Sequence, residues 1–185
     1  TNCRPSGVQS SSNRQLPAAL IMLLTLALSI ALVADTVHFP VVTSTNLEGK
    51  TLTLPRDFAG ERNIVFVAFL RKQQDDVDTW VPFVKQLLAR TPGTDYYEIP
   101  TIKRMVAPMR WMINRGMKGG IDDRSARDRT VTLYIDKDPF KQALGITDEN
   151  TIHVLVVDRA GHVWWRTTGA FDAGKGQELE QALKR

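Results

Sequence analysis

The chain has 185 residues, a formal net charge of +4, 43% hydrophobic residues and 24% charged residues. These values suit one globular domain with a sizeable core, and they exclude a chain that is disordered throughout. The single cysteine, Cys3, excludes an intrachain disulfide.

The N-terminal region divides into two segments. Residues 1–15 are polar and serine-rich, which predicts a disordered tail. Residues 16–34 are apolar and uncharged, close to the ~20 residues that a helix needs to cross a bilayer, so we expect a transmembrane anchor. Because Arg4 and Arg14 precede it without an acid, the domain at 37–185 should lie on the non-cytoplasmic side, periplasmic or extracellular. A cleaved signal with a secreted domain is the alternative, since Ser29-Ile30-Ala31 resembles a cleavage site.

The first half of the domain shows strand patterns followed by a helical one. We expect a hairpin from His38–Val42 and Lys50–Pro55, a buried central strand at Ile64–Leu70 and a helix at Thr79–Leu88. Aspartates at 75, 76 and 78 precede that helix, where negative charge complements the helix dipole, and Pro82 lies within it.

The second half alternates strands and helices and ends in a hairpin and a helix. We expect a strand at Tyr96–Pro100, a helix at Thr101–Met117 that is broken or kinked at Pro108, and a strand at Thr130–Ile135. A short helix capped by Asp138 and closed by Gly145 should follow, then a hairpin from His153–Asp158 and His162–Arg166, and a helix at Gly176–Lys184. This order predicts an α/β protein, a three-layer α/β/α sandwich around a central mixed sheet.

Several short segments carry a family resemblance. Trp80 and Pro82-Phe83 follow the buried strand, and Ala143–Ile146, Ile152–Asp158 and Gly161–Arg166 follow in order. With these segments, residues 39–183 resemble the thioredoxin-like superfamily of the peroxiredoxin-related type. The C-terminal half is similar to mitochondrial ATP-synthase assembly factors, which have this fold without active cysteines. The resemblance implies a binding or assembly role at a membrane complex, without catalysis or a cofactor.

Both halves of the usual thioredoxin active site are replaced. Counting back from the helix proline, the two cysteine positions fall on Gln74 and Val77, with Asp75 and Asp76 between them, and the cis-proline position falls on His153. Without a thiolate, thiol–disulfide exchange and thiol-based peroxide reduction are excluded there.

Asp75, Asp76 and His153 admit two interpretations. They form a carboxylate–imidazole cluster for a general base or a metal, or the aspartates cap a helix while His153 fills the space of the proline. These residues do not form a metal-ligand signature, and we expect no metal.

The basic residues are concentrated in one segment. Residues 103–129 hold eight Lys or Arg and three Asp, a net charge of +5, which leaves the rest of the chain near −1. The segment is either a solvated face balanced by acids elsewhere in the fold or a surface for an anionic partner. As that partner we expect a membrane protein or membrane complex, with an anionic lipid surface as the alternative and no nucleic acid. The candidate partner-binding residues are Arg104, Arg110, Trp111, Arg115, Arg127 and Arg129.

Some of these side chains could serve either in the core or in partner binding. The methionines of the segment and Trp111 suit either a hydrophobic core or an adaptable binding surface. Arg127-Asp128-Arg129 suits an internal salt-bridge cluster as well as a binding site. Trp164 and Trp165 are adjacent on a strand, so we expect one in the core and the other more exposed.

Together these features favour a membrane-anchored, redox-inactive binding or assembly factor. The alternative is an enzyme, or a protein that binds a ligand or a metal, using non-cysteine residues of the degenerate site.

Overall fold

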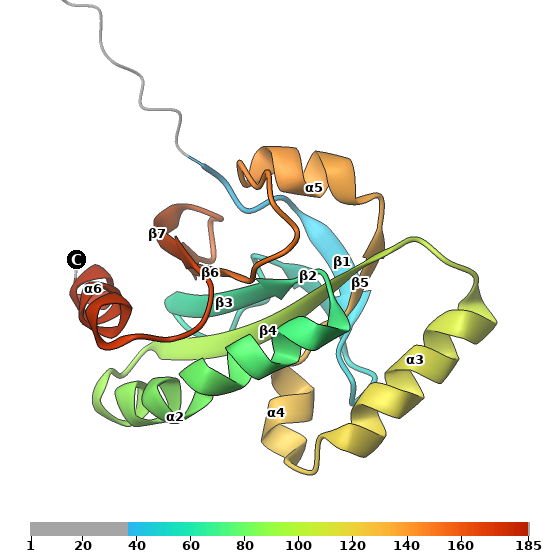
Figure 1. The fold of residues 1–185 in the computed structure, drawn as a ribbon, viewed down its shortest axis with the longest axis horizontal. Helices are drawn as coiled ribbons and strands as arrows, with labels where there is room; N and C mark the ends of the chain where they lie inside the picture. The colour runs from blue at the N-terminus through green and yellow to red at the C-terminus, as the bar shows by residue number, and fades with distance from the viewer. Residues whose placement is uncertain (1–36, 185) are drawn as a thin grey trace, which may run out of the picture. The chain divides into compact units, whose positions relative to one another are not determined.

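The structure is a computed structural model, and it describes residues 37–184 (Figure 1). The expected tail at 1–15, the apolar segment at 16–34 and Cys3 lie outside the described residues. Among the helices at 37–184, none is long and apolar enough to cross a membrane.

The centre of the domain is a five-stranded mixed sheet in the order β5-β4-β3-β6-β7. The strands are β3 (Arg62–Ala68), β4 (Thr94–Lys103), β5 (Leu133–Ile135), β6 (His153–Asp158) and β7 (Val163–Thr168). β3 pairs in parallel with β4, and β4 in parallel with β5, whereas β6 runs antiparallel to β3 and β7. The continuous apolar run therefore forms the central strand, buried on both faces as predicted.

Alternation along β3 divides the core into two layers. Ile64 and Phe66 pack with α2 (Gln74–Arg90) and α6 (Ala173–Leu183), which cover one face of the sheet (Figure 1). Val65 and Val67 point to the other face and pack with Phe39, with β2 and with α5 (Lys137–Ala143). The predicted three-layer mixed α/β architecture is confirmed.

The N-terminal hairpin forms a separate two-stranded sheet. β1 (Val42–Thr45) pairs antiparallel with β2 (Thr51–Leu54). The hairpin was predicted, but its first strand begins at Val42 rather than at His38.

The region between β4 and β5 differs most from the prediction. We expected a helix from Thr101, but Thr101 to Lys103 continue β4 and pair with Leu133 to Ile135 of β5. The helix α3 (Ala107–Gly120) begins only after this pairing ends. Pro108 lies in its first turn, where its missing N–H leaves no hydrogen bond unmade, so it does not break the helix. A short helix, α4 (Arg124–Arg129), leads to β5.

Other boundaries shift by a few residues. α2 begins at Gln74 after a 3₁₀ turn, η2 (Arg71–Gln73), and not at Thr79. α5 is capped by Asp136, whose side chain accepts a hydrogen bond from the Asp138 N–H, so the expected cap at Asp138 was wrong. α6 begins at Ala173, capped by Asp172. Each difference lengthens or shifts an element without changing the order of elements.

Candidate functional site

The turn between β3 and α2 is held by one buried side chain, Gln73. It is 1% exposed, and its Oε1 accepts hydrogen bonds from the backbone N–H groups of Phe69 at 2.7 Å and Leu70 at 3.0 Å. Its Nε2 donates to the Glu149 carbonyl at 2.7 Å. One amide therefore satisfies two donors at the end of β3 and ties the turn to the loop before β6.

The cysteine positions of the thioredoxin pattern occupy the first turn of α2. Val77 is 2% exposed and packs in the core layer with Trp80. Gln74 is exposed, and its Nε2 donates to Asp78 Oδ1 and to Glu98 Oε2. Asp75 and Asp76 lie in the same turn, where their charge complements the helix dipole. The first turn of α2 thus packs and hydrogen-bonds without a thiol.

His153 begins β6 beside the end of β3, where it pairs with Val67. Its ring lies edge-on to Phe69, with centroids 6.1 Å apart. His153 Nε2 lies 2.7 Å from the Asp148 carbonyl oxygen, so this nitrogen carries the proton in that contact. In the part of the chain the structure describes, no group of three or more His, Cys, Asp or Glu side chains is placed to hold a metal ion.

Glu98 is a buried carboxyl in β4 that the sequence analysis missed as a site residue. It is 8% exposed and lies beside Gln74. Burial raises the pKa of the Glu98 carboxyl, and the nearby Asp78 charge adds to this, against the hydrogen bond from Gln74. The available signal was a lone acid inside an apolar strand pattern.

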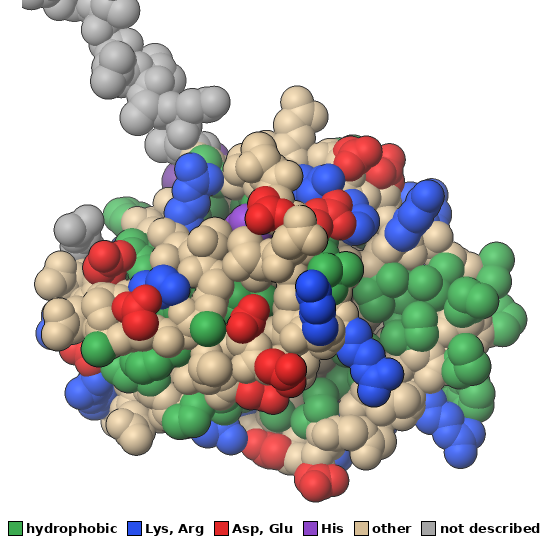
Figure 2. Space-filling view, in the orientation of Figure 1, with side chains coloured by type: hydrophobic (Ala, Val, Ile, Leu, Met, Phe, Trp, Pro, Cys, Tyr) green, Lys and Arg blue, Asp and Glu red, His purple; other side chains and the backbone are tan. Residues whose placement is uncertain are grey.

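α3 is the most exposed element of the basic segment. Taking residues 37–184 together, no α3 side chain is buried. Trp111 is 62% exposed, Met112 61% and Met109 49%, and Val106 just before the helix is 68% exposed. An apolar patch covers this side of the molecule in the space-filling view (Figure 2). Met109, Met112 and Trp111 therefore do not belong to the core.

The remaining candidate arginines divide by environment. Arg104, Arg110 and Arg115 are exposed, and the guanidinium of Arg115 lies over the Trp111 ring at 5.2 Å from its centroid. Arg127 and Arg129 point inward. Arg127 Nε donates to Glu48 Oε1 at 2.6 Å, and Arg129 Nε donates to Asp95 Oδ1 at 2.6 Å. This is the internal arrangement that the sequence analysis kept as an alternative.

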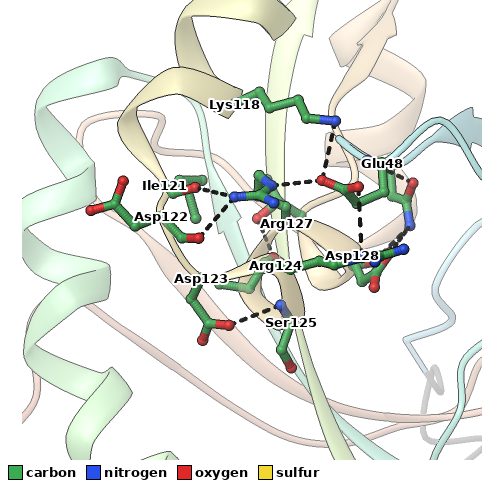
Figure 3. Close-up of polar contacts among 12 residues, drawn as sticks. Glu48, Lys118, Ile121, Asp122, Asp123, Arg124, Ser125, Arg127 and Asp128 are labelled. Atoms are coloured by element: carbon green, nitrogen blue, oxygen red, sulfur yellow. Dashed lines mark hydrogen bonds and ion pairs between the residues drawn. The ribbon is translucent and has the colours of Figure 1, made fainter.

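Glu48 joins the hairpin to the basic segment (Figure 3). Its carboxylate contacts Arg127 and also Lys118 Nζ at 3.2 Å. Arg127 in turn donates to the carbonyls of Ile121 at 2.8 Å and Asp122 at 2.9 Å. The Arg127 and Lys118 hydrogen bonds hold the pKa of the Glu48 carboxyl below its ordinary value, so the cluster is charged at neutral pH.

A hollow of about 870 Å³ opens beside α4 and the N-terminal hairpin. Its charged lining residues are Lys50, Asp57, Asp95, Asp123, Arg124, Asp128 and Arg129. Four carboxylates against three cations do not favour an anionic ligand there.

The two adjacent tryptophans divide as predicted. Trp164 is 45% exposed, and its Nε1 donates to Asp158 Oδ2 at 3.0 Å, with the Arg62 guanidinium 3.9 Å from the ring centroid. Trp165 is partly buried and packs against the layer that contains Trp80. Trp164 is therefore a second exposed aromatic side chain, on β7.

No protein-family model matches the chain, and no curated protein matches its sequence. Solved structures do match. BsSco, a member of the Sco family of cytochrome c oxidase assembly proteins, is 14% identical with a TM-score of 0.54, covering 80% of this chain and 92% of its own. A thiol:disulfide interchange protein from Bacteroides sp. is 17% identical with a TM-score of 0.51, covering 81% and 90%. The pneumococcal exposed lipoprotein thioredoxin from Streptococcus pneumoniae strain TIGR4 is 13% identical with a TM-score of 0.50, covering 78% and 98%.

The fold is thioredoxin-like. At these identities the similarity establishes the fold alone, and the narrower likeness to assembly factors stays a prediction. Two of the three neighbours are named for thiol–disulfide exchange or as thioredoxins, whereas residues 37–184 of this thioredoxin-like chain contain no cysteine.

Proposed function

We propose that this protein is a membrane-anchored, redox-inactive thioredoxin-like factor that binds a membrane protein complex and assists its assembly on the non-cytoplasmic side. The apolar segment at 16–34 would serve as the anchor. The basic segment would provide the binding surface through Arg104, Arg110, Trp111 and Arg115.

The observation that carries the proposal is the chemistry of the degenerate turn. Gln74 and Val77 replace the two thiols, and Gln73 uses both ends of its amide to hold the backbone closed. A turn of this kind stabilises the fold but offers no group that accepts or transfers electrons. A thioredoxin-like domain without its redox group retains a rigid scaffold for binding.

The exposed α3 is the second support. A soluble helix normally buries its apolar side, but α3 exposes Met109, Met112 and Trp111 beside arginines. Exposed apolar surface of this kind marks interaction sites, and arginine and tryptophan are enriched among binding hot spots.

The enzymatic alternative has weaker support. Within residues 37–184, no three metal-ligating side chains come together, and the His153 ring already donates to a backbone carbonyl. Glu98 is a buried acid of raised pKa next to Gln74, so an acid–base role at the turn would depend on it.

A pull-down tests the proposed function. Full-length protein purified from its native membrane in mild detergent should retain one recurrent membrane complex, identified by mass spectrometry. Replacing Arg104, Arg110 and Arg115 by Gln should remove that complex without unfolding the domain, because all three side chains are exposed. A complex that is retained unchanged by the triple variant would contradict the assigned surface.

A further inference from the structure

The helix α3 attaches to the domain by its polar side. The Tyr134 hydroxyl donates to Asn114 Oδ1 at 2.7 Å, and Lys118 pairs with Glu48 at 3.2 Å. Between these polar contacts, Met117 Sδ accepts a hydrogen bond from the Thr132 hydroxyl at 3.8 Å. The helix therefore faces the domain mainly with groups that water could equally satisfy.

The opposite side of α3 is apolar and open. Met109 and Met112 are three residues apart, so they lie on one face of the helix, and Gly116 follows at the next turn. A Cβ built on Gly116 would meet no atom within 4 Å. Trp111 lies about 100° around the helix from Met112, on the side of Arg115, and the exposed Val106 precedes the helix. The apolar patch in Figure 2 overlies α3 as Figure 1 places it.

The charge around α3 has one sign. No Asp or Glu occurs between Glu98 and Asp122, whereas this stretch contains Lys103, Arg104, Arg110, Arg115 and Lys118. Lys118 is paired with Glu48, and the Arg110 guanidinium lies 6.0 Å from the Tyr134 ring centroid. Within residues 37–184, Lys103, Arg104, Arg110 and Arg115 form no ion pair with an acid. An apolar face with basic borders and an interfacial tryptophan is the pattern of a helix that lies in a membrane surface.

We propose that α3 lies on an anionic lipid surface, with Met109, Met112 and Trp111 at the headgroup boundary and the arginines on lipid phosphates and carboxylates. This inference rests on the proposed function in one respect, that the domain works at a membrane. The inference adds that α3 itself contacts the lipid of that membrane.

Charge complementarity favours an anionic lipid surface over a second copy of this chain at this face. A second copy would bring two acid-free, arginine-bearing helices together, and like charges at close range repel. Each basic residue near an anionic surface strengthens binding about fivefold.

The test follows Trp111 fluorescence in the full-length chain. The protein is reconstituted into vesicles of phosphatidylcholine alone or of phosphatidylcholine with phosphatidylserine, each doped with lipid brominated on its acyl chains. The difference between the wild type and Trp111→Phe isolates Trp111. Trp164→Phe is the matched control, because it removes the other exposed tryptophan, which lies on β7.

With phosphatidylserine we expect the Trp111 signal to shift to shorter wavelength and to be quenched by bromine. With phosphatidylcholine alone the quenching should be lost. Arg110→Gln with Arg115→Gln should lower the docking equilibrium about 25-fold, at about fivefold for each charge. Quenching that is equal in the two vesicle types, or absent from both, would overturn the inference.

The outcomes separate this inference from the proposed function. A membrane complex that depends on Trp111 in the pull-down, without lipid quenching, would assign α3 to a protein partner and leave the assembly role standing. Quenching that requires phosphatidylserine, without any recurrent complex, would support the lipid surface and remove the assembly role.

Discussion

The degenerate turn buries a polar side chain, whereas α3 exposes apolar ones. At the turn, Gln73 is buried with both ends of its amide bonded, and Val77 packs in the core. In α3 no side chain is buried with respect to residues 37–184, and Trp111 and Met112 are more than half exposed. In thioredoxins the turn carries the chemistry. Here the turn contains no cysteine and is held by packing and hydrogen bonds, and the exposed apolar side chains lie on α3.

The core around the turn is closely packed. The sheet and the α2 and α6 layer are packed, and every fully buried side-chain nitrogen or oxygen found between residues 37 and 184 has a hydrogen-bond partner. α3, which has no buried side chain among residues 37–184, lies outside that core.

Replacing one tryptophan in each region should give the largest difference in the free energy of unfolding. Trp80 in α2 is fully buried, and its Nε1 donates to the Gly169 carbonyl at 3.0 Å. Trp80→Ala should lower the free energy of unfolding by about 4 kcal/mol, because it opens a cavity and removes that bond. Trp111→Ala should change it by less than about 0.5 kcal/mol. Urea unfolding followed by circular dichroism measures both, and equal losses would mean that α3 packs into the core.

Gln73 and Gln74 are neighbours at the turn, but their replacement should change the free energy of unfolding by different amounts. Gln73→Ala leaves the Phe69 and Leu70 N–H groups without their acceptor, and we expect a loss of about 3 kcal/mol in the free energy of unfolding. Gln74→Ala removes only exposed or partly exposed contacts and should cost less than about 1 kcal/mol. The same denaturant titration compares them. A tolerated Gln73→Ala would show that the turn does not depend on this amide.

Glu98 gives a smaller effect that depends on pH. Burial raises its pKa in the folded state, so its charged form opposes folding, and this cost grows as pH rises through the folded-state pKa. Glu98→Gln should therefore stabilise the protein at neutral pH by about 1 kcal/mol. The difference should vanish below about pH 4, where the wild-type carboxyl is protonated in both states. Thermal unfolding of both proteins across this range measures it, and a variant less stable at neutral pH would contradict the assignment.

The sequence predicted the order of elements because hydrophobic periodicity reports burial directly. Ile64–Phe66 and Val154–Val157 are buried on both faces of a sheet, and both were recognised. The end of β4 was missed because Thr101 to Lys103 have a neutral local pattern, and their strand state comes from pairing with β5, which is more than 30 residues away. Tertiary pairing decided that boundary.

The site was predictable only in part. Counting from Pro82 located the turn, because the offset between the turn and the helix proline is local. The role of Gln73 was not predicted, because its partner Glu149 is 76 positions away along the chain. The exposure of Met109 and Met112 was also undecided, since a methionine face at helical spacing suits a core and a binding surface equally.

The most direct test of the central claim compares two full-length variants in the native pull-down. One replaces Arg104, Arg110 and Arg115 by Gln on and beside α3, and the other combines Asp75→Asn, Asp76→Asn and His153→Ala at the turn. If the protein works through α3, the membrane complex is lost from the first variant and retained by the second. Loss from the turn variant alone, with both proteins folded, would contradict the account and return the function to the degenerate site.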